Sequence, residues 1–518
     1  MGPVSKWLLA IVVCGLSCAE VAAQCPARPA SGTVVNNPFS ISPQNGVLTA
    51  QMTLERSVDR FGYTHYCYEY TTVGGVVEAP TLRLNRGDEL ALQIFNRIQD
   101  DDAMKMTMEA GSSQMCGDGG AFTLDTTNVH FHGMNIPPKC HQDDVINTLI
   151  QPGRSFQYDI RIPQNQKPGL YWYHPHVHGF TEFQVNGGAA GALIVEGMEK
   201  IRPEVAGLTE RVFIVRQQYL VPWVPGPYQL SLNYQVAPLI GGLGSTPVIQ
   251  MKAGEKQFWR VANATIQDFI PLQFQVNGAA QPLEVIALDG YPLAKTRMQN
   301  TILIPPAGRA EFIVQAPATG STAVLYTDAY STGPTGNPDV AQNLATIQLT
   351  EQAASSPMPN SPSSPEDAGV IDVAEQAVTA QRSLYFSEEF GGTNGPIQFY
   401  ITVDGQKQKV FEANEKPVIT TKVGAVEDWT IENRALETHA FHMHQIHFLV
   451  LAVDGKPVAN KDLRDTIEIP FWEGKGPFHS VKVRMDFRDP RTAGMFLFHC
   501  HVLLHEDLGM MHKILVEP

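Results

Sequence analysis

Histidines recur at alternate positions in this chain more often than their number explains. For 16 histidines in 518 residues, chance would give about half of one His-x-His pair, whereas the sequence contains five. Because alternate side chains of a β-strand point to the same face, each pair would present two imidazoles side by side. Imidazoles gathered in this way predict a site for several metal ions. Four of the pairs are His130 with His132, His174 with His176, His442 with His444, and His499 with His501.

A cysteine separates the two histidines of the last pair. In a strand, Cys500 would face away from both of its neighbours, and His505 and Met510 follow closely enough to fold back onto it. Thiolate, imidazole and a weak thioether are the ligands of a trigonal blue-copper electron-transfer site, once a second imidazole is added. His439, just before the third pair, can supply that imidazole. One peptide segment would then connect two metal environments.

The pairs are confined to the two ends of the chain. No histidine lies between His178 and His439. Eight imidazoles from two folded units can hold a three-copper cluster at their interface, with three on each of two coppers and two on the third. The middle of the chain contains none of these ligands, so we expect it to repeat the fold without the metal.

An internal repeat indicates the units that position these residues. A proline, a glycine seven residues later and an asparagine nine residues after that occur three times, over 80–96, 247–263 and 417–433. Each copy predicts a strand, a glycine turn and a second strand, because glycine permits a positive backbone angle between two apolar runs. With a charged fraction of only 17%, the repeat predicts an all-β protein of three tandem β-sandwich domains.

The domain boundaries follow from composition and length. We expect a first domain over 24–200, a second over 201–350, a Ser/Pro-rich linker over 351–381 and a third domain over 382–518. The run Ser355–Pro365 is rich in serine and proline, which predicts an exposed spacer.

The first 23 residues predict export. Lys6 precedes an apolar run, and small residues precede a cleavage point before Gln24. No later run is long enough for a membrane helix, so we expect a periplasmic or secreted protein without an anchor. Its net charge of −15 argues against nucleic-acid binding. With Cys500 as a ligand, four cysteines remain for two disulfides, which allow three pairings; they are Cys25, Cys67, Cys116 and Cys140.

Four segments resemble the copper-binding signatures of the multicopper oxidases. The resemblance covers nearly the whole mature chain and implies three cupredoxin-like Greek-key sandwiches with four copper ions: one type 1, one type 2 and two type 3. It implies oxidation of a substrate at the type 1 copper and reduction of dioxygen to water at the other three. The segments are His130-Phe-His132-Gly133, His174-Pro-His176, His439-Ala-Phe-His442-Met-His444 and His499-Cys-His501-x3-His505-x4-Met510.

The matching motif positions imply a role for each ligand. His439, Cys500, His505 and Met510 would hold the type 1 copper, and His130 and His442 the type 2 copper. The type 3 pair would be held by His132, His174, His176, His444, His499 and His501. We expect His178 to act as a hydrogen-bonding neighbour of these ligands.

Reducing dioxygen also requires an acid that delivers protons. Asp143 falls where the laccase branch of the family has an acid beside the solvent channel, although Asp144 is an alternative because the local motif differs. Glu506, directly after His505, is the second candidate. We expect Asp143 to be the donor.

The substrate is less closely defined by the sequence. An axial Met510 favours easily oxidised donors, and we expect oxidation of phenols or aromatic amines by a monomeric enzyme. One alternative is a cuprous-ion oxidase that detoxifies copper, for which Met104, Met106, Met108 and Met115 could bind the ion. The other is a non-catalytic copper-binding protein.

Overall fold

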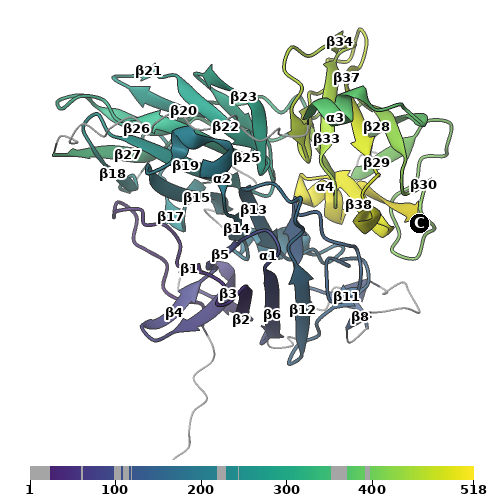
Figure 1. Ribbon diagram of the computed structural model, residues 1–518, viewed down its shortest axis with the longest axis horizontal. Helices are drawn as coiled ribbons and strands as arrows, with labels where there is room; N and C mark the ends of the chain where they lie inside the picture. The colour runs from purple at the N-terminus through teal and green to yellow at the C-terminus, as the bar shows by residue number, and fades with distance from the viewer. Residues whose placement is uncertain are drawn as a thin grey trace, which may run out of the picture.

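The computed structural model describes residues 24–59, 62–98, 107–108, 116–117, 120–218, 229–242, 244–351, 370–390 and 397–518. The predicted signal segment and the run Ser355–Pro365 lie outside these residues, as does the methionine cluster except for the backbone of β7 (Thr107–Met108). The chain is all-β, as predicted, and its strands pair in three groups that follow one another along the sequence. Figure 1 shows the first group below, the second at upper left and the third at upper right.

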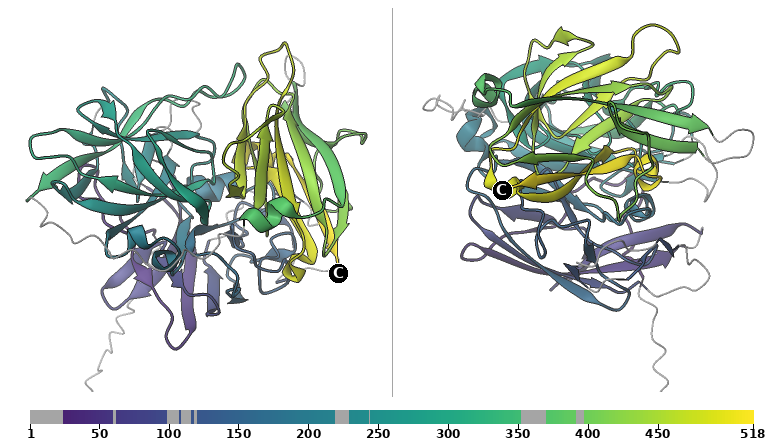
Figure 2. Two further views of the ribbon diagram at one scale, coloured as in Figure 1. Left: turned by 45° about the horizontal axis from the view of Figure 1, so that its top comes forward. Right: turned by 90° about the vertical axis from the view of Figure 1, so that its right-hand side faces the viewer.

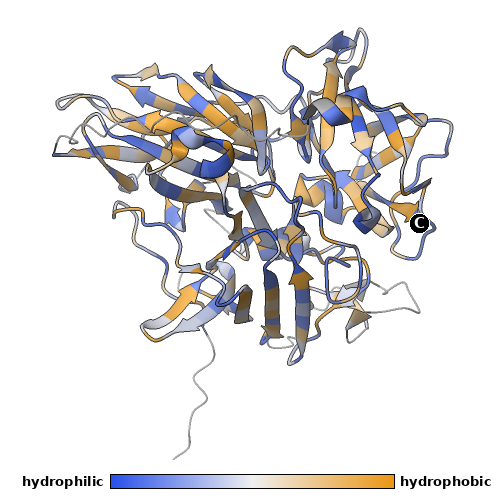
Figure 3. Ribbon diagram, viewed as in Figure 1, coloured by the Kyte–Doolittle hydropathy of each residue, from blue (hydrophilic) through white to orange (hydrophobic). Residues whose placement is uncertain are grey.

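The first group forms two packed sheets whose strands alternate between buried and more exposed positions. The alternation is visible as bands of colour along β6 and β12 (Figure 3) and is typical of sandwich strands. One sheet has the order β1 (Ser40–Ile41), β5 (Thr81–Leu84), β14 (Gly191–Val195), β13 (Gly169–His174) and β10 (His130–His132). The other has the order β12 (Ser155–Arg161), β6 (Glu89–Asn96), β2 (Val47–Val58), β3 (Thr64–Thr72) and β4 (Gly75–Glu78).

The second group repeats this two-sheet plan. One sheet has the order β17 (Gln235–Val236), β16 (Gln229–Leu232), β15 (Thr209–Gln218), β19 (Lys256–Asn263), β25 (Arg309–Gln315), β22 (Leu283–Leu288) and β23 (Tyr291–Gln299). The other has the order β18 (Val248–Lys252), β27 (Gln342–Thr350), β26 (Ala323–Thr327), β20 (Ile270–Val276) and β21 (Ala279–Ala280), with β24 (Ile302–Ile304) beside β20.

The third group also consists of two packed sheets, which Figure 2 shows face to face. One sheet has the order β29 (Ile397–Val403), β28 (Ala380–Phe390), β31 (Val426–Asn433), β37 (His479–Asp486), β33 (Phe448–Val453) and β34 (Lys456–Pro457), with β35 (Leu463–Arg464) beside β33. The other has the order β30 (Ile419–Lys422), β39 (Met511–Glu517), β38 (Gly494–Cys500), β32 (His439–Met443) and β36 (Thr466–Ile469). The helices are short, among them α1 (Thr181–Asn186), α3 (Val370–Glu375) and α4 (Leu503–Asp507).

The sequence repeat corresponds to the same strand–turn–strand unit in each group, as predicted. Its glycine has φ of 86° at Gly87, 76° at Gly254 and 94° at Gly424. The asparagine at the end of the unit is buried and donates from Nδ2 to two backbone carbonyls, which Asn263 finds at Asp268 and Ile304. Asn96 and Asn433 make the equivalent pair of hydrogen bonds. A buried amide that satisfies two carbonyls explains why the repeat ends in asparagine.

Each group of strands encloses its own apolar core. Val35 lies within the predicted first domain but packs into the second core, beside a bridge from Val34 to Val248. The exact domain boundaries stay a prediction. The two predicted disulfides are confirmed, and they join Cys25 to Cys67 and Cys116 to Cys140. Among the described residues, no helix is long and apolar enough to cross a membrane.

Candidate metal centres

The four His-x-His pairs meet where the first and third groups of strands face each other. One pair lies wholly within β10. In the other three, the first histidine lies in β13, β32 or β38 and the second lies just beyond the end of that strand, so the expected placement of both imidazoles on one strand holds only for His130 and His132. The rings of His130 and His444 stack with centroids 4.0 Å apart, and those of His132 and His442 with centroids 3.9 Å apart. Residues more than 300 positions apart in the sequence therefore share one buried site.

Three groups of imidazole nitrogens form within this site. In each group the nitrogens lie within 4.8 Å of one another, and every histidine is buried. Two of the groups share no residue and account for six histidines, which is what a pair of three-coordinate metal ions needs. The groups are His132, His174 and His501; His176, His444 and His499; and His130, His132 and His442.

Hydrogen bonds to the outer ring nitrogens orient these imidazoles. His174 Nδ1 donates to the Pro175 carbonyl at 2.8 Å, and His442 Nδ1 donates to the Asp465 carbonyl at 2.8 Å. Nε2 of both rings has no hydrogen-bond partner and is buried. Fixing one ring nitrogen in this way selects the tautomer and leaves the other nitrogen free for a metal.

Burial favours the neutral form of these imidazoles. It lowers the pKa of His176 to about 3, because the cost of burying a charge outweighs the opposing attraction of Glu506. Burial likewise lowers the pKa well below its ordinary value at His132, His174, His442, His444 and His501. Neutral imidazoles bind metal without having to lose a proton first.

A separate buried group contains the free cysteine. Cys500 Sγ lies 3.5 Å from His439 Nδ1 and 3.8 Å from His505 Nδ1, and the two imidazole nitrogens are 3.2 Å apart. Met510 is buried in the same core cluster, and its backbone carbonyl accepts from the Cys500 N–H at 3.0 Å. Burial raises the pKa of the Cys500 thiol, so a metal ion would have to displace its proton on binding.

The donor sets suit copper. A thiolate with two imidazoles and a nearby thioether is the soft, trigonal set that copper electron-transfer sites use. At the larger site, buried ring nitrogens without any hydrogen-bond partner remain on both sides of the junction: on His130, His132, His174, His442, His444 and His501. Orphaned polar atoms of this kind are costly unless a ligand satisfies them.

Asp143, not Asp144, is the acid that contacts the histidines. Both of its carboxylate oxygens lie 3.0 Å from His130 Nδ1, and Oδ1 also accepts from the Phe131 N–H at 3.0 Å. Gln445 Nε2 donates to Oδ2 at 2.5 Å. Asp144 instead accepts from Asn147. With three donors directed at it, Asp143 is held as an acceptor that orients His130.

Glu506 lies between the imidazole groups. It is fully buried, with Oε2 3.1 Å from His499 Nδ1 and Oε1 3.5 Å from His176 Nε2. Thr181 Oγ1 donates to Oε1 at 3.1 Å. Burial favours the neutral carboxyl, but the interactions with His176 and His499 oppose it and lower the pKa of Glu506. Glu506 is thus held as an acceptor beside two histidines of one group.

An ion pair that sequence reasoning missed ties the second group of strands to this site. Arg309 donates from Nη1 and Nη2 to Asp465 at 2.7 and 2.5 Å, and both residues are fully buried. Asp465 Oδ1 lies 3.4 Å from His132 Nε2. Nothing in the sequence connects Arg309 with Asp465.

Two more carboxylates lie against the cysteine-containing group and were also missed. Glu388 Oε1 is 3.3 Å from His439 Nε2, and Glu437 Oε2 is 3.6 Å from His505 Nε2. Burial and then the charge of Glu388 raise the pKa of Glu437 to about 8. Since His439 and His505 direct Nδ1 at Cys500, these acids lie at the opposite edge of each ring.

The remaining histidines lie outside the groups. His178 packs edge-on against Phe122 and Phe411, and its Nδ1 has no hydrogen-bond partner; its expected hydrogen-bonding role stays a prediction. His447 donates to the Asp289 carbonyl at 2.8 Å and lies 3.4 Å from Asp465.

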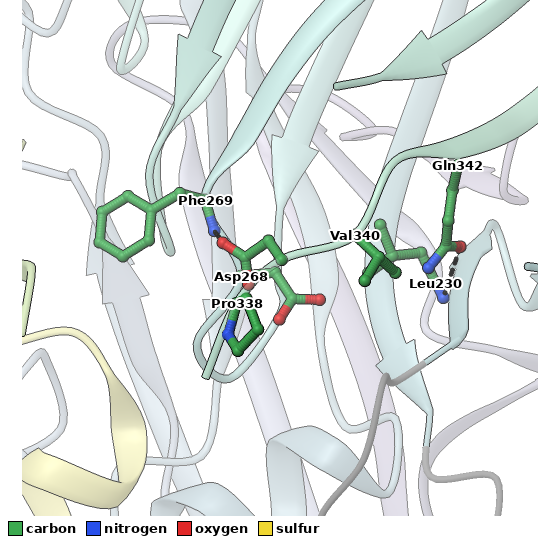
Figure 4. Close-up of a pocket in the computed structure, with 7 residues that line it drawn as sticks. Leu230, Asp268, Phe269, Pro338, Val340 and Gln342 are labelled. Carbon is green, nitrogen blue, oxygen red and sulfur yellow. Dashed lines mark hydrogen bonds between the residues drawn. The ribbon is translucent and has the colours of Figure 1, made fainter. Parts of the chain in front are cut away.

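A pair of buried carboxyl groups lies in two loops of the second group, with Asp268 between β19 and β20 and Asp339 between β26 and β27. Asp268 is hydrogen-bonded to Asp339, whose Oδ2 accepts from the Phe269 N–H at 2.9 Å. Figure 4 shows Asp268 and Phe269 beside Pro338, around a cavity of about 10 Å³. The loop that contains Asp339 also contacts the third group, because the Thr332 carbonyl accepts a hydrogen bond from the Thr438 N–H at 2.7 Å.

This pair predicts a pH-dependent stability. Burial raises the pKa of Asp268 to about 7, and burial together with the charge of Asp268 raises that of Asp339 to about 10. The folded state therefore keeps protons that the unfolded chain has released, so stability falls as pH rises towards these values. Between pH 7 and 10, the free energy of unfolding should decrease less steeply in Asp339→Asn than in the unmodified protein, by up to about 1.4 kcal/mol per pH unit.

Urea unfolding at several pH values tests this, with Asp404→Asn on the exposed surface as the control. If the unfolding free energy of Asp339→Asn fell with pH as steeply as that of the unmodified protein, the raised pKa of Asp339 would be ruled out as the cause of the pH dependence.

Comparison with known proteins agrees with this geometry. Models of the multicopper oxidase family match residues 121–200, 216–352 and 391–518, which together make up more than half of the chain. The chain belongs to the multicopper oxidase family. It is therefore an oxidoreductase that uses dioxygen as acceptor, and it has the predicted fold of three cupredoxin-like sandwiches.

Several relatives extend over almost the whole length. A multicopper oxidase of Staphylococcus aureus is 26% identical over 85% of this chain and 83% of its own. A laccase of Bacillus subtilis is 23% identical over 85% of this chain and 88% of its own. Among solved structures, a multicopper oxidase from Campylobacter jejuni described as a metallo-oxidase superposes with a TM-score of 0.68. It is 21% identical, over 95% of this chain and 96% of that one.

Proposed function

We propose that this oxidase couples one-electron oxidation of a reducing substrate, with phenols or aromatic amines favoured, to the four-electron reduction of dioxygen to water. The observation that carries the proposal is the position of β38. Its Cys500 belongs to the thiolate group, and the adjacent His499 and His501 belong to the two different imidazole groups. The end of β38 and the residue that follows it, His501, therefore connect the two kinds of site by covalent bonds.

The proposed ligand assignment follows the groups. Type 1 copper would be held by His439, Cys500, His505 and Met510, and type 2 copper by His130 and His442. The two type 3 coppers would be held by His132, His174 and His501, and by His176, His444 and His499. When bound, the four coppers supply the electron transfer and the oxygen chemistry. The groups of ligand atoms within 4.8 Å support this assignment for the histidines and Cys500, and the match to the motif positions supports it for Met510.

The chain's own residues would handle the protons and the geometry. Glu506, buried beside His176 and His499, would deliver protons to the oxygen site. Asp143 would hold the His130 ring through its Nδ1. We therefore prefer Glu506 to Asp143 as the proton donor, because Asp143 already accepts three hydrogen bonds.

We also propose an exported monomer whose domains span 24–200, 201–350 and 382–518. Two disulfides support an oxidising compartment, and a first segment with the composition of a secretory signal supports export. Three separate cores support the division into domains.

Cuprous-ion oxidation is the second candidate function, and one specific observation favours it. Glu388 and Glu437 place carboxylates within 3.6 Å of the outer ring edges of His439 and His505. Carboxyl oxygens at the point where electrons would enter can bind a cationic donor, which would displace the proton that Glu437 holds below about pH 8, and they offer nothing comparable to a neutral phenol.

The variant Glu437→Gln separates the two candidates. If the donor is cuprous ion, its KM should rise about tenfold, as expected when an interaction of roughly 1.4 kcal/mol is lost, while the KM for a methoxyphenol stays unchanged. Oxygen uptake with each donor measures this, and Glu389→Gln on the exposed part of β28 is the control. An equal rise in KM for cuprous ion and for the methoxyphenol would contradict a cation site. No uptake with either donor from the unmodified, copper-loaded protein would instead support a copper-binding protein without activity.

A further inference from the structure

A cavity of about 460 Å³ lies between the first and second groups of strands, apart from the metal centres. It is lined by the segment 26–38, by the end of β4, by Arg216 of β15, and by the turn that leads into β17. Figure 1 shows β4 at the lower left, with β17 and β15 above it. The volume of the cavity is in the range of small-molecule sites. None of its lining residues belongs to the groups that could hold copper.

An arginine that lines this cavity is buried without a full set of partners. Arg216 is 2% exposed, and its Nη2 donates to the Ala190 carbonyl at 2.5 Å. Its Nε and Nη1 have no hydrogen-bond partner among the residues that the structure describes. A buried cation normally has both a counter-charge and hydrogen-bond acceptors, because desolvating it alone is costly.

The carboxylate of the cavity is already engaged by a second arginine. Arg28 donates to Glu78 at 2.8 and 3.2 Å and to the Gly187 carbonyl at 2.6 Å. Within the described part of the chain, no carboxylate lies within ion-pairing distance of Arg216. The cavity therefore has two guanidinium groups and one carboxylate, which is paired with Arg28 alone, and it keeps a net positive charge. Burial lowers the pKa of Arg216, and the attraction of Tyr234 and Glu78 does not compensate for it.

A strained turn holds an aromatic ring against both cations. Tyr234 has φ of 68°, a left-handed conformation that bulky residues rarely adopt. Its ring centroid lies 3.8 Å from Cζ of Arg216 and 4.5 Å from Cζ of Arg28. Backbone strain of this kind is often kept where a binding site needs a fixed side chain. Stacking fixes the planes of the two guanidinium groups and leaves the remaining Arg216 donors for another partner.

The other lining groups favour an organic anion. Asn233 is fully used by backbone groups, because it donates to the Asn36 and Val212 carbonyls and accepts from the Ile214 N–H. Pro26, Pro38, Val76 and Val77 add apolar walls. A guanidinium binds a carboxylate through two parallel hydrogen bonds, and apolar walls suit the organic part of such a ligand.

We propose that this cavity binds a small organic carboxylate through the free donors of Arg216, with Tyr234 and the apolar walls against its carbon skeleton. The ligand would join the segment 26–38 and β4 to the second group of strands. Binding would therefore stabilise the fold by mass action and leave the electron path through Cys500 unchanged.

Thermal unfolding of the copper-loaded protein tests the site with benzoate as the probe and benzamide, its uncharged counterpart, as the matched control at constant ionic strength. Benzoate should raise the melting temperature in a saturable manner and benzamide should not. Arg216→Met should abolish the response, whereas Arg211→Met, on the same strand, should keep it. The blue absorption of each variant reports that it has folded.

Calorimetric titration of the unmodified protein with benzoate supplies a readout that needs no variant, and it should give saturable binding of one equivalent. Equal responses to benzoate and benzamide, or a benzoate response that survives in Arg216→Met, would overturn the proposal. So would the absence of benzoate binding to the unmodified protein. Loss of oxygen uptake would instead bear on the proposed oxidase function, which this binding assay does not measure.

Discussion

Replacing Cys500 by serine is expected to abolish both the blue absorption and the oxidase activity while the protein stays folded. The thiolate is the ligand that gives a trigonal copper site its electron-transfer character, and a serine hydroxyl is a poor substitute. Serine is also nearly the same size as cysteine, so the fully buried position keeps its packing. Absorption spectroscopy, circular dichroism and oxygen uptake on the same preparation measure the three properties.

His130→Ala supplies the contrast to Cys500→Ser. His130 lies in the imidazole groups and not in the thiolate group, so this variant should keep the blue absorption and lose dioxygen reduction. Spin-resonance spectra should show the loss of the type 2 signal. Oxygen uptake that persists in Cys500→Ser would exclude the electron path through β38.

Glu506→Gln is expected to lower kcat by about 10²- to 10⁴-fold, the usual contribution of a general acid. Glutamine keeps the size of the side chain and can still accept from Thr181 Oγ1, but it cannot release a proton. The blue absorption should be unchanged because the thiolate group is intact. Steady-state oxygen uptake should slow, because it depends on dioxygen reduction. Anaerobic bleaching of the blue absorption by substrate should keep its rate, because it reports only electron transfer from the substrate.

Asp143→Asn distinguishes a positioning role from proton donation. Because Asp143 contacts His130 Nδ1 at 3.0 Å, its loss should alter the type 2 spin-resonance signal. If Asp143→Asn lowered kcat by the larger factor with an unchanged type 2 signal, and Glu506→Gln had no effect, then Asp143 would be the proton donor.

The residues that the sequence predicted well are those whose chemistry is local. Residues two positions apart stay close together wherever their segment is placed, so the pairs and Cys500 could be recognised without a fold, although only His130 and His132 lie on one strand as expected. The repeat was equally local, since its proline, glycine and asparagine define a single strand–turn–strand unit. Its buried asparagines find their partners within 54 residues.

What the sequence could not provide depends on contacts between distant segments. Arg309 and Asp465 are 156 positions apart and meet only because the second and third groups of strands pack together. Glu388 reaches His439 from a different sheet in the same way. The choice between Asp143 and Asp144 depended on which side chain a loop turns inward, and no periodic pattern predicts that.

The measurement that tests the central claim most directly is the number of substrate molecules oxidised per dioxygen consumed. With a one-electron phenolic donor and the copper-loaded protein, the account predicts four donors oxidised for each dioxygen and no accumulation of hydrogen peroxide. Two donors per dioxygen with peroxide as the product would contradict a cluster in which His130, His442 and the two groups of three histidines act together.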